Sequence, residues 1–238
     1  MLAEFKTELN DSEITDIDNY CRSVDYFALE QSIGFAEIIY KSGINYFLLK
    51  DENRILSFCQ ISESFKAAHI WYGPVCNERE HVLITIDEII RYYKKRGFWY
   101  LGVQMYLKAG SDCDFIEYKL NSRHRIRYVF DNSNTKASLE LDLSQTIEGL
   151  FREFRKGHKS DIKKAISSGI VVEESNNEKI EAFAHIYRKM CNARSIRGHT
   201  ASEVVNIIEY LKARNQGELL VAQTPEGEVI GGSVFVYQ

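Results

Sequence analysis

The residues best suited to chemistry form a basic cluster in the second half of the chain. Residues 152–164 carry six cations against the two carboxylates of Glu153 and Asp161; the cations are Arg152, Arg155, Lys156, Lys159, Lys163 and Lys164. On a helix, the spacing of three and four residues places Lys156, Lys159 and Lys163 on one face, with Arg152 on roughly the same side. Stacked cations of this kind bind a pyrophosphate or an RNA backbone through charge-assisted hydrogen bonds. A solvated face with i,i+4 ion pairs is the alternative, and Lys159 and Lys163 are the leading candidates for ligand contact.

A second candidate is the polar turn of residues 194–199, Arg-Ser-Ile-Arg-Gly-His. A fixed guanidinium suits a phosphate or carboxylate, so Arg194 or Arg197 is a candidate binding residue. His199 could act as a base near neutral pH, but a structural role, such as capping a helix that begins near Thr200, is favoured.

Two weaker candidates involve predicted strands. Arg123, Arg125 and Arg127 alternate along one of them and would share one face as a phosphate or RNA platform, although a solvent-facing strand is favoured. Tyr237 ends the last predicted strand and is a candidate for pointing into a cleft. Gly231 and Gly232, also within that strand, indicate a bulge or a close approach to a ligand.

Composition excludes several classes of protein. A net charge of −4 argues against a general nucleic-acid binder, and no apolar run is long enough to span a membrane. The acidic N-terminus is no signal peptide, and five scattered cysteines without a C-x-x-C pair favour a cytoplasmic protein with reduced thiols and no bound metal. The phosphate-loop, dinucleotide, zinc-protease and serine-hydrolase motifs are all absent from the sequence.

The hydrophobic pattern predicts an α/β chain of the layered α+β type. In the first half we expect helices at 12–22, 31–41, 79–95 and 112–120, and strands at 45–50, 54–62, 67–72, 98–106, 125–130 and 137–143. In the second half we expect helices at 145–155, 158–168, 177–193 and 202–214, and strands at 170–174, 219–223 and 229–237. Both halves contain helices followed by an antiparallel pair, which indicates a duplicated fold with domains at 1–143 and 144–238.

Four segments, taken in order, resemble the Fem-type acyltransferases of the GNAT superfamily. Residues 31–37 are similar to a Q-S-x-x-W helix, and residues 71–75 to a G-P turn. Residues 159–172 resemble the pattern K-x-x-I-K-K-A-x-x-x-G-v-x-v, and residues 217–237 resemble the hairpin of the second domain. Phe35 stands where the family has Trp, and Ile39 where it often has a phosphate-binding Lys, so Lys41 is the nearest cation.

The resemblance implies two tandem GNAT-like domains, with mixed sheets flanked by helices and the second domain incomplete. It implies transfer of an acyl or aminoacyl group to a peptidoglycan or polysaccharide precursor. The donor would be an acyl-CoA or an aminoacyl-tRNA, and the acceptor phosphorylated or lipid-linked, with tRNA a partner in the second case. An Arg near position 194 would face the acceptor, and the first domain would not be a CoA site.

Two alternatives stay open from the sequence. The chain could be a binding module that keeps the acceptor cleft without the chemistry. It could also form a homodimer, because strand 229–237 would present an open apolar edge to a second copy.

Overall fold

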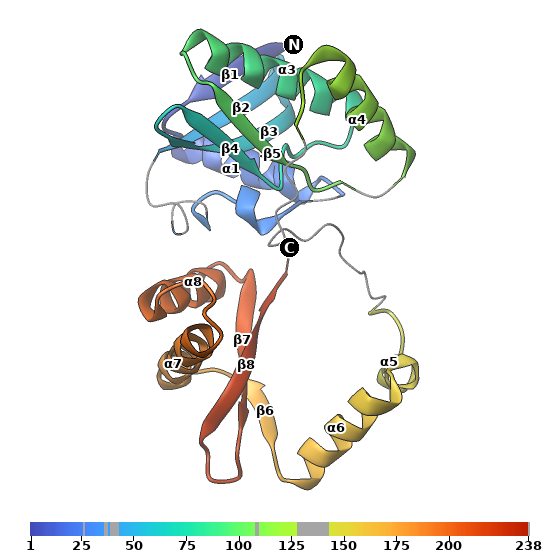
Figure 1. Ribbon diagram of the computed structural model, residues 1–238, viewed down its shortest axis with the longest axis vertical. Helices are drawn as coiled ribbons and strands as arrows, with labels where there is room; N and C mark the ends of the chain where they lie inside the picture. Colours follow the sequence, from blue (N-terminus) through green and yellow to red (C-terminus); the bar gives the residue numbers. More distant parts are fainter. Residues whose placement is uncertain (26, 36–37, 39–42, 108–109, 128–142, 238) are drawn as a thin grey trace. The chain divides into compact units, whose positions relative to one another are not determined.

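The computed structural model describes all residues except 26, 36–37, 39–42, 108–109, 128–142 and 238 (Figure 1). The chain divides into two compact units, Met1–Ile126 together with Val236–Gln238, and Arg127–Phe235. The domain boundary predicted between residues 143 and 144 stays a prediction.

Unit one is built around a five-stranded sheet in the order β1-β2-β3-β4-β5. The first four strands pair antiparallel, and β5 lies parallel to β4. The parallel pair needs a crossover, which α3 supplies between the two strands. The elements in chain order are β1 (Leu2–Lys6), α1 (Asp11–Arg22), the short 3-10 helix η1 (Leu29–Gln31), β2 (Ile44–Asp51), β3 (Arg54–Ser64), β4 (Ala67–Trp71), α3 (Arg79–Lys95), β5 (Tyr100–Gln104) and α4 (Ser111–Arg123).

Helices cover both faces of this sheet, so its central strands are apolar on both sides. Phe47 and Leu49 of β2 point to the face packed by α3 and α4. Tyr46 and Leu48 alternate with them and point to the face packed by α1. This explains why β2 is a continuous apolar run, since a strand buried on both faces has no polar side to expose.

The structure corrects the predicted elements of unit one at two places. Strand β1 was not predicted, although its five residues pair with β2 along their whole length. The strand predicted at 125–130 is wrong over its described part, because Arg123 ends α4 and residues 125–127 have no regular structure. Asp87 of α3 accepts hydrogen bonds from Arg123 and His124, both at 2.6 Å, which holds the end of α4 beside α3. Residues 36–37 and 39–41 of the helix predicted at 31–41, and residues 137–142 of the strand predicted at 137–143, lie outside the described part.

Unit two contains a three-stranded sheet in the order β6-β7-β8. Its elements are α5 (Ile147–Glu153), α6 (Lys156–Ser167), β6 (Val171–Glu174), α7 (Asn177–Ala193), α8 (Ala201–Ala213), β7 (Gly217–Gln223) and β8 (Val229–Val236). Helices α7 and α8 pack on one face of the sheet, where Ile180, Ile208 and Leu219 are fully buried or nearly so (Figure 1).

The two units share one order of elements, as the predicted duplication requires. In each, a strand is followed by helical segments and then by a hairpin, and the first strand pairs antiparallel with the first strand of the hairpin. The strand β1 is what makes the match complete, since it corresponds to β6.

Candidate functional site

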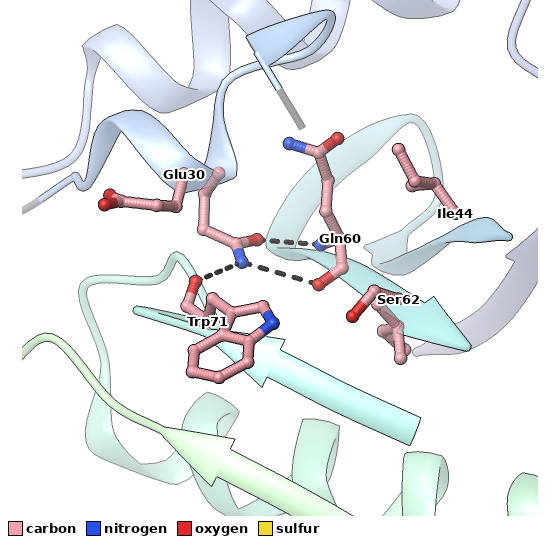
Figure 2. Close-up of a pocket in the computed structure, with 7 residues that line it drawn as sticks. Glu30, Ile44, Gln60, Ser62 and Trp71 are labelled. Carbon is pink, nitrogen blue, oxygen red and sulfur yellow. Dashed lines mark hydrogen bonds between the residues drawn. The ribbon is translucent and has the colours of Figure 1, made fainter. Parts of the chain in front are cut away.

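The side chain of Gln31 bridges two strands of unit one where their backbones do not pair. Its Nε2 donates to the carbonyl of Trp71 at 2.7 Å, and its Oε1 accepts from the backbone N–H of Gln60 at 2.7 Å (Figure 2). A longer contact of 3.4 Å joins Nε2 to the carbonyl of Gln60. A primary amide has the donor and acceptor pattern of a peptide group, so Gln31 replaces a missing piece of the β3–β4 ladder.

The gap that Gln31 fills results from a change of register. Ser62 to Ser64 of β3 pair with β4 from His69 back to Ala67, and further along β3 an isolated bridge joins Phe58 to Val75. Ser62 and Phe58 are four residues apart on β3, whereas their partners His69 and Val75 are six apart, so the partner segment contains two extra residues. An added Cβ on Gly73 would lie 2.9 Å from Cδ of Gln31, so the glycine leaves the room that this side chain needs.

Two of the four segments that carried the sequence resemblance therefore touch each other. The first contributes Gln31, and the second contributes the Trp71 carbonyl and Gly73. Their joint presence in the sequence has a physical reason, because the glutamine and the turn form one hydrogen-bonded unit.

A small pocket lies beside this bridge on the α1 face of the sheet. Its lining comes from η1, β2, β3 and the end of β4, and consists of Glu30, Gln31, Ile44, Gln60, Ile61, Ser62 and Trp71 (Figure 2). The side chain of Gln60 is 4% exposed, and neither polar atom of its amide has a hydrogen-bond partner in the described part of the chain. Burial also raises the pKa of Glu30. An unsatisfied buried amide is costly, and the space beside it has room for little more than a water molecule.

An aromatic surface continues from the pocket across β4 and β5. The rings of Trp71 and His69 stack with centroids 5.7 Å apart and planes 9° apart, and the ring of Tyr100 lies 5.2 Å from that of His69. Burial lowers the pKa of His69, which favours the neutral imidazole. Sequence reasoning missed this surface; the signal was the period of two in His69-Ile70-Trp71, which puts both rings on one face of the predicted strand.

The strands β4 and β5 stay paired to their ends. The register runs from Ala67 with Tyr100 to Trp71 with Gln104, and the N–H of Gly73 then donates to the carbonyl of Gln104 at 3.1 Å. This pair therefore offers no row of free N–H groups to stabilise an oxyanion. The expectation that the first domain is not a CoA site stays a prediction.

The basic cluster of unit two is divided between two helices. Arg152 lies in α5, whereas Lys156, Lys159 and Lys163 lie in α6 at the predicted helical spacing. Nζ of Lys159 donates to the carbonyl of Arg152 at 2.7 Å, which holds the end of α5 against α6. Lys163 is exposed, and no ion pair to it is found among the described residues. Ligand contact by Lys159 and Lys163 stays a prediction.

Hydrogen bonds from two side chains of α7 fix the polar turn between α7 and α8. Arg188 donates to the carbonyl of His199 at 2.9 Å, and the hydroxyl of Tyr187 accepts from the backbone N–H of His199 at 3.3 Å. Thr200, not His199, is the N-cap of α8, and its side chain accepts from Glu203 in a capping box. Arg194 and Arg197 are exposed on this turn, and their role in binding an acceptor stays a prediction.

The roles predicted for Lys41, Tyr237 and the edge of β8 stay predictions. Lys41 is outside the described residues. Tyr237 follows the end of β8 and is 45% exposed, and its orientation toward a cleft stays a prediction. The strand β8 stands at one edge of its sheet, and pairing of this edge with a second chain is likewise untested.

The described residues contain neither a membrane-spanning helix nor a group of side chains suited to a metal ion. None of the described helices is long and apolar enough to cross a membrane. Among the same residues, no group of three His, Cys, Asp or Glu side chains could hold a metal ion.

Comparison with known proteins identifies the fold. No protein-family model matches the chain, and no curated protein matches its sequence. A crystal structure of FemX superimposes with a TM-score of 0.68 over 94% of this chain, at 14% identity. The structure of L-PGS from Bacillus licheniformis gives a TM-score of 0.53 over 98%, at 11% identity.

The chain spans 58% of the length of the FemX chain and 65% of that of L-PGS. These likenesses confirm the layered α+β fold class that the sequence predicted. Over nearly its whole length, this chain therefore has the Fem-type fold of FemX.

Proposed function

We propose that the protein is an acyltransferase that moves an acyl or aminoacyl group onto an amine or hydroxyl of a cell-envelope precursor. The observation that carries this proposal is the FemX-like fold over 94% of the chain, reached independently of the four sequence segments that resemble Fem-type enzymes. The acceptor would be a peptidoglycan or polysaccharide precursor with a phosphate or lipid-linked end.

The described residues supply binding more than proton transfer. In unit one, the stacked rings of His69 and Trp71 form a flat aromatic surface, which would support a sugar or peptide group. In unit two, Lys159 and Lys163 are placed on one helix where they would attract a phosphate. Acyl-CoA and aminoacyl-tRNA both carry phosphates, so the same cations would serve either donor.

The proposed reaction is a direct transfer. The amine or hydroxyl of the acceptor attacks the carbonyl carbon of the donor ester or thioester, and the new bond forms as the bond to the leaving oxygen or sulfur breaks. The proton lost by the nucleophile balances the one gained by the leaving group. The protein contributes mainly by holding the two substrates together, which can account for a large part of an enzymatic rate.

The test is transfer by the full chain from labelled acetyl-CoA or aminoacyl-tRNA to a panel of cell-envelope precursors. We expect Lys159→Ala and Lys163→Ala to raise the KM for the phosphate-bearing substrate about tenfold each, by loss of a charge-assisted hydrogen bond. Lys164→Ala is the matched control, because it removes an exposed lysine from another side of the same helix. Equal effects of all three substitutions would refute the proposed role of these two lysines.

A different outcome would favour the binding module. If the chain binds phosphate-bearing precursors, loses that binding in Lys159→Ala, and yet transfers no label from any donor, then the proposal of transfer is wrong for this chain.

A further inference from the structure

One region of unit one carries exposed aromatic side chains. Phe65 is 100% exposed and Trp99 is 80% exposed, and Tyr100 beside them is 38% exposed. We call these three residues the aromatic tip. Single exposed apolar residues are ordinary, but exposed aromatic side chains gathered on neighbouring segments usually mark an interaction surface.

The aromatic tip is assembled from two segments far apart in the sequence. Ser64 pairs with Ala67, so Phe65 and Lys66 form the two-residue loop of the β3–β4 hairpin. The backbone N–H of Trp99 donates to the carbonyl of Lys66 at 3.1 Å. Nζ of Lys66 in turn donates to the carbonyl of Arg96 at 3.2 Å. These two hydrogen bonds hold the hairpin loop beside the segment that follows α3, so the three rings are presented by a defined backbone.

Phe65 occupies a conformation that does not suit its type. Its φ is +54°, in the left-handed region that favours glycine and asparagine, where a β-carbon lies too close to the following carbonyl oxygen. The ring is fully exposed, and no aromatic or cation contact to it is found in the described part of the chain, so no packing offsets this unfavourable contact. A residue that breaks a local rule without a structural gain points to function.

The charge around the aromatic tip is opposite to that of the chain. Residues 63–66 and 94–100 carry the cations Lys66, Lys94, Lys95 and Arg96 and only the carboxylate of Glu63, which pairs with Arg96 at 2.6 Å. The chain as a whole has a net charge of −4. Lys66, Lys94 and Lys95 are exposed, so the two segments that carry the rings also carry exposed cations, on a protein whose net charge is negative.

We propose that the aromatic tip inserts into the interface of an anionic phospholipid bilayer, with Lys66, Lys94 and Lys95 contacting the lipid phosphates. Exposed aromatic rings prefer the depth of the headgroups, and basic side chains beside them add attraction to anionic lipids. The two contributions are present together on one rigid surface. This inference stands apart from the proposed acyl transfer, although a membrane-bound protein would meet a lipid-linked acceptor at the same surface.

The first experiment measures binding of the full chain to vesicles. We expect co-sedimentation with vesicles of 70% phosphatidylcholine and 30% phosphatidylserine (~30% anionic lipid, a level that gives a substantial negative surface potential) and much weaker binding to pure phosphatidylcholine. Phe65→Asn should lower the partition coefficient about tenfold, through the loss of one buried aromatic side chain. Lys94→Gln and Lys95→Gln should lower it about fivefold each, and 0.5 M salt should reduce binding further (roughly a 4 Å screening length).

The variant Phe65→Asn separates binding from folding. Asparagine accepts a positive φ better than phenylalanine, so the variant should melt at the same temperature as the parent or higher. Tyr118→Ser is the control, because Tyr118 is an aromatic residue with 69% exposure on α4 and lies outside the aromatic tip. Tyr118→Ser should bind vesicles as the parent does.

A spectroscopic measurement tests insertion directly. The chain has two tryptophans, so Trp71→Phe leaves Trp99 as the only one. Its fluorescence should shift to shorter wavelength on addition of anionic vesicles and be quenched by lipids brominated near the headgroup. The proposal is overturned if anionic vesicles neither bind the chain nor shift this emission, or if Phe65→Asn binds them as well as the parent. Binding of single-stranded RNA by the aromatic tip in the absence of vesicle binding would also overturn it.

Discussion

The hydrogen bonds of Gln31 predict a large loss of stability when its amide is removed. Gln31→Met keeps the length and the flexibility of the side chain but removes the donor and the acceptor. Two backbone groups then lose their partners, the N–H of Gln60 and the carbonyl of Trp71, each bonded at 2.7 Å in the parent. Gln31 is 1% exposed, so water cannot readily replace the amide.

The expected magnitude follows from these two groups. A buried polar group without a partner costs about 1–3 kcal/mol. The N–H of Gln60 is buried, whereas the Trp71 bond is only part-buried, so we assign the second group the lower part of that range. Gln31→Met should therefore lower the free energy of unfolding by about 2–4 kcal/mol.

The neighbouring glutamine provides the matched control with the opposite expectation. The side-chain amide of Gln60 is buried with no partner in the described part of the chain. Gln60→Met removes an unsatisfied polar group and fills the same space, so its effect should be neutral or stabilising, within about 1 kcal/mol. Urea denaturation at pH 7 measures both variants, with an unchanged dependence on denaturant showing that the unfolded state is the same. If Gln31→Met costs no more than Gln60→Met, the bridging role assigned to Gln31 is wrong.

Two further predictions concern stability. Burial raises the pKa of Glu30, so the folded state favours its protonated form, and stability falls as pH rises through and above the unfolded value of 4.5. Glu30→Gln should therefore unfold at higher urea than the parent at pH 7, with the difference shrinking near about pH 4; a constant difference would contradict this. In β8, a Cβ on Gly232 would lie 2.8 Å from the Leu220 carbonyl, whereas one on Gly231 would meet nothing within 4 Å. Gly232→Ala should cost about 1–3 kcal/mol and Gly231→Ala about 0.5 kcal/mol or less by thermal melting, and equal losses would show that the strand relaxes around both.

The sequence predicts best those elements whose signals are local. The helices at 79–95 and 177–193 have the predicted bounds, because apolar residues recur at helical spacing between clear stops. The predicted hairpin of residues 219–223 and 229–237 forms as β7 and β8 around a turn rich in proline and glycine. Strand β1 escaped prediction because it is short and carries two charges in five residues, and its stability comes from pairing with β2, at least 40 residues away.

The candidate site shows the same division between local and distant information. Lys159 and Lys163 could be placed on one helical face, since the spacing of α6 is a property of neighbouring residues. The aromatic surface of His69, Trp71 and Tyr100 needs the parallel pairing of β4 with β5, which no local pattern specifies.

The sequence by itself determined the fold class, most of the helices and hairpins, and the order of segments that resembles the Fem-type family. Only the tertiary structure decided what two of those segments do together. Gln31 and Trp71 are 40 residues apart, and the amide of one completes the backbone hydrogen bonding of the other. Such a contact cannot be predicted from the sequence, because a hydrogen bond depends on the position and direction of two groups. Only the folded sheet brings these two groups within 2.7 Å.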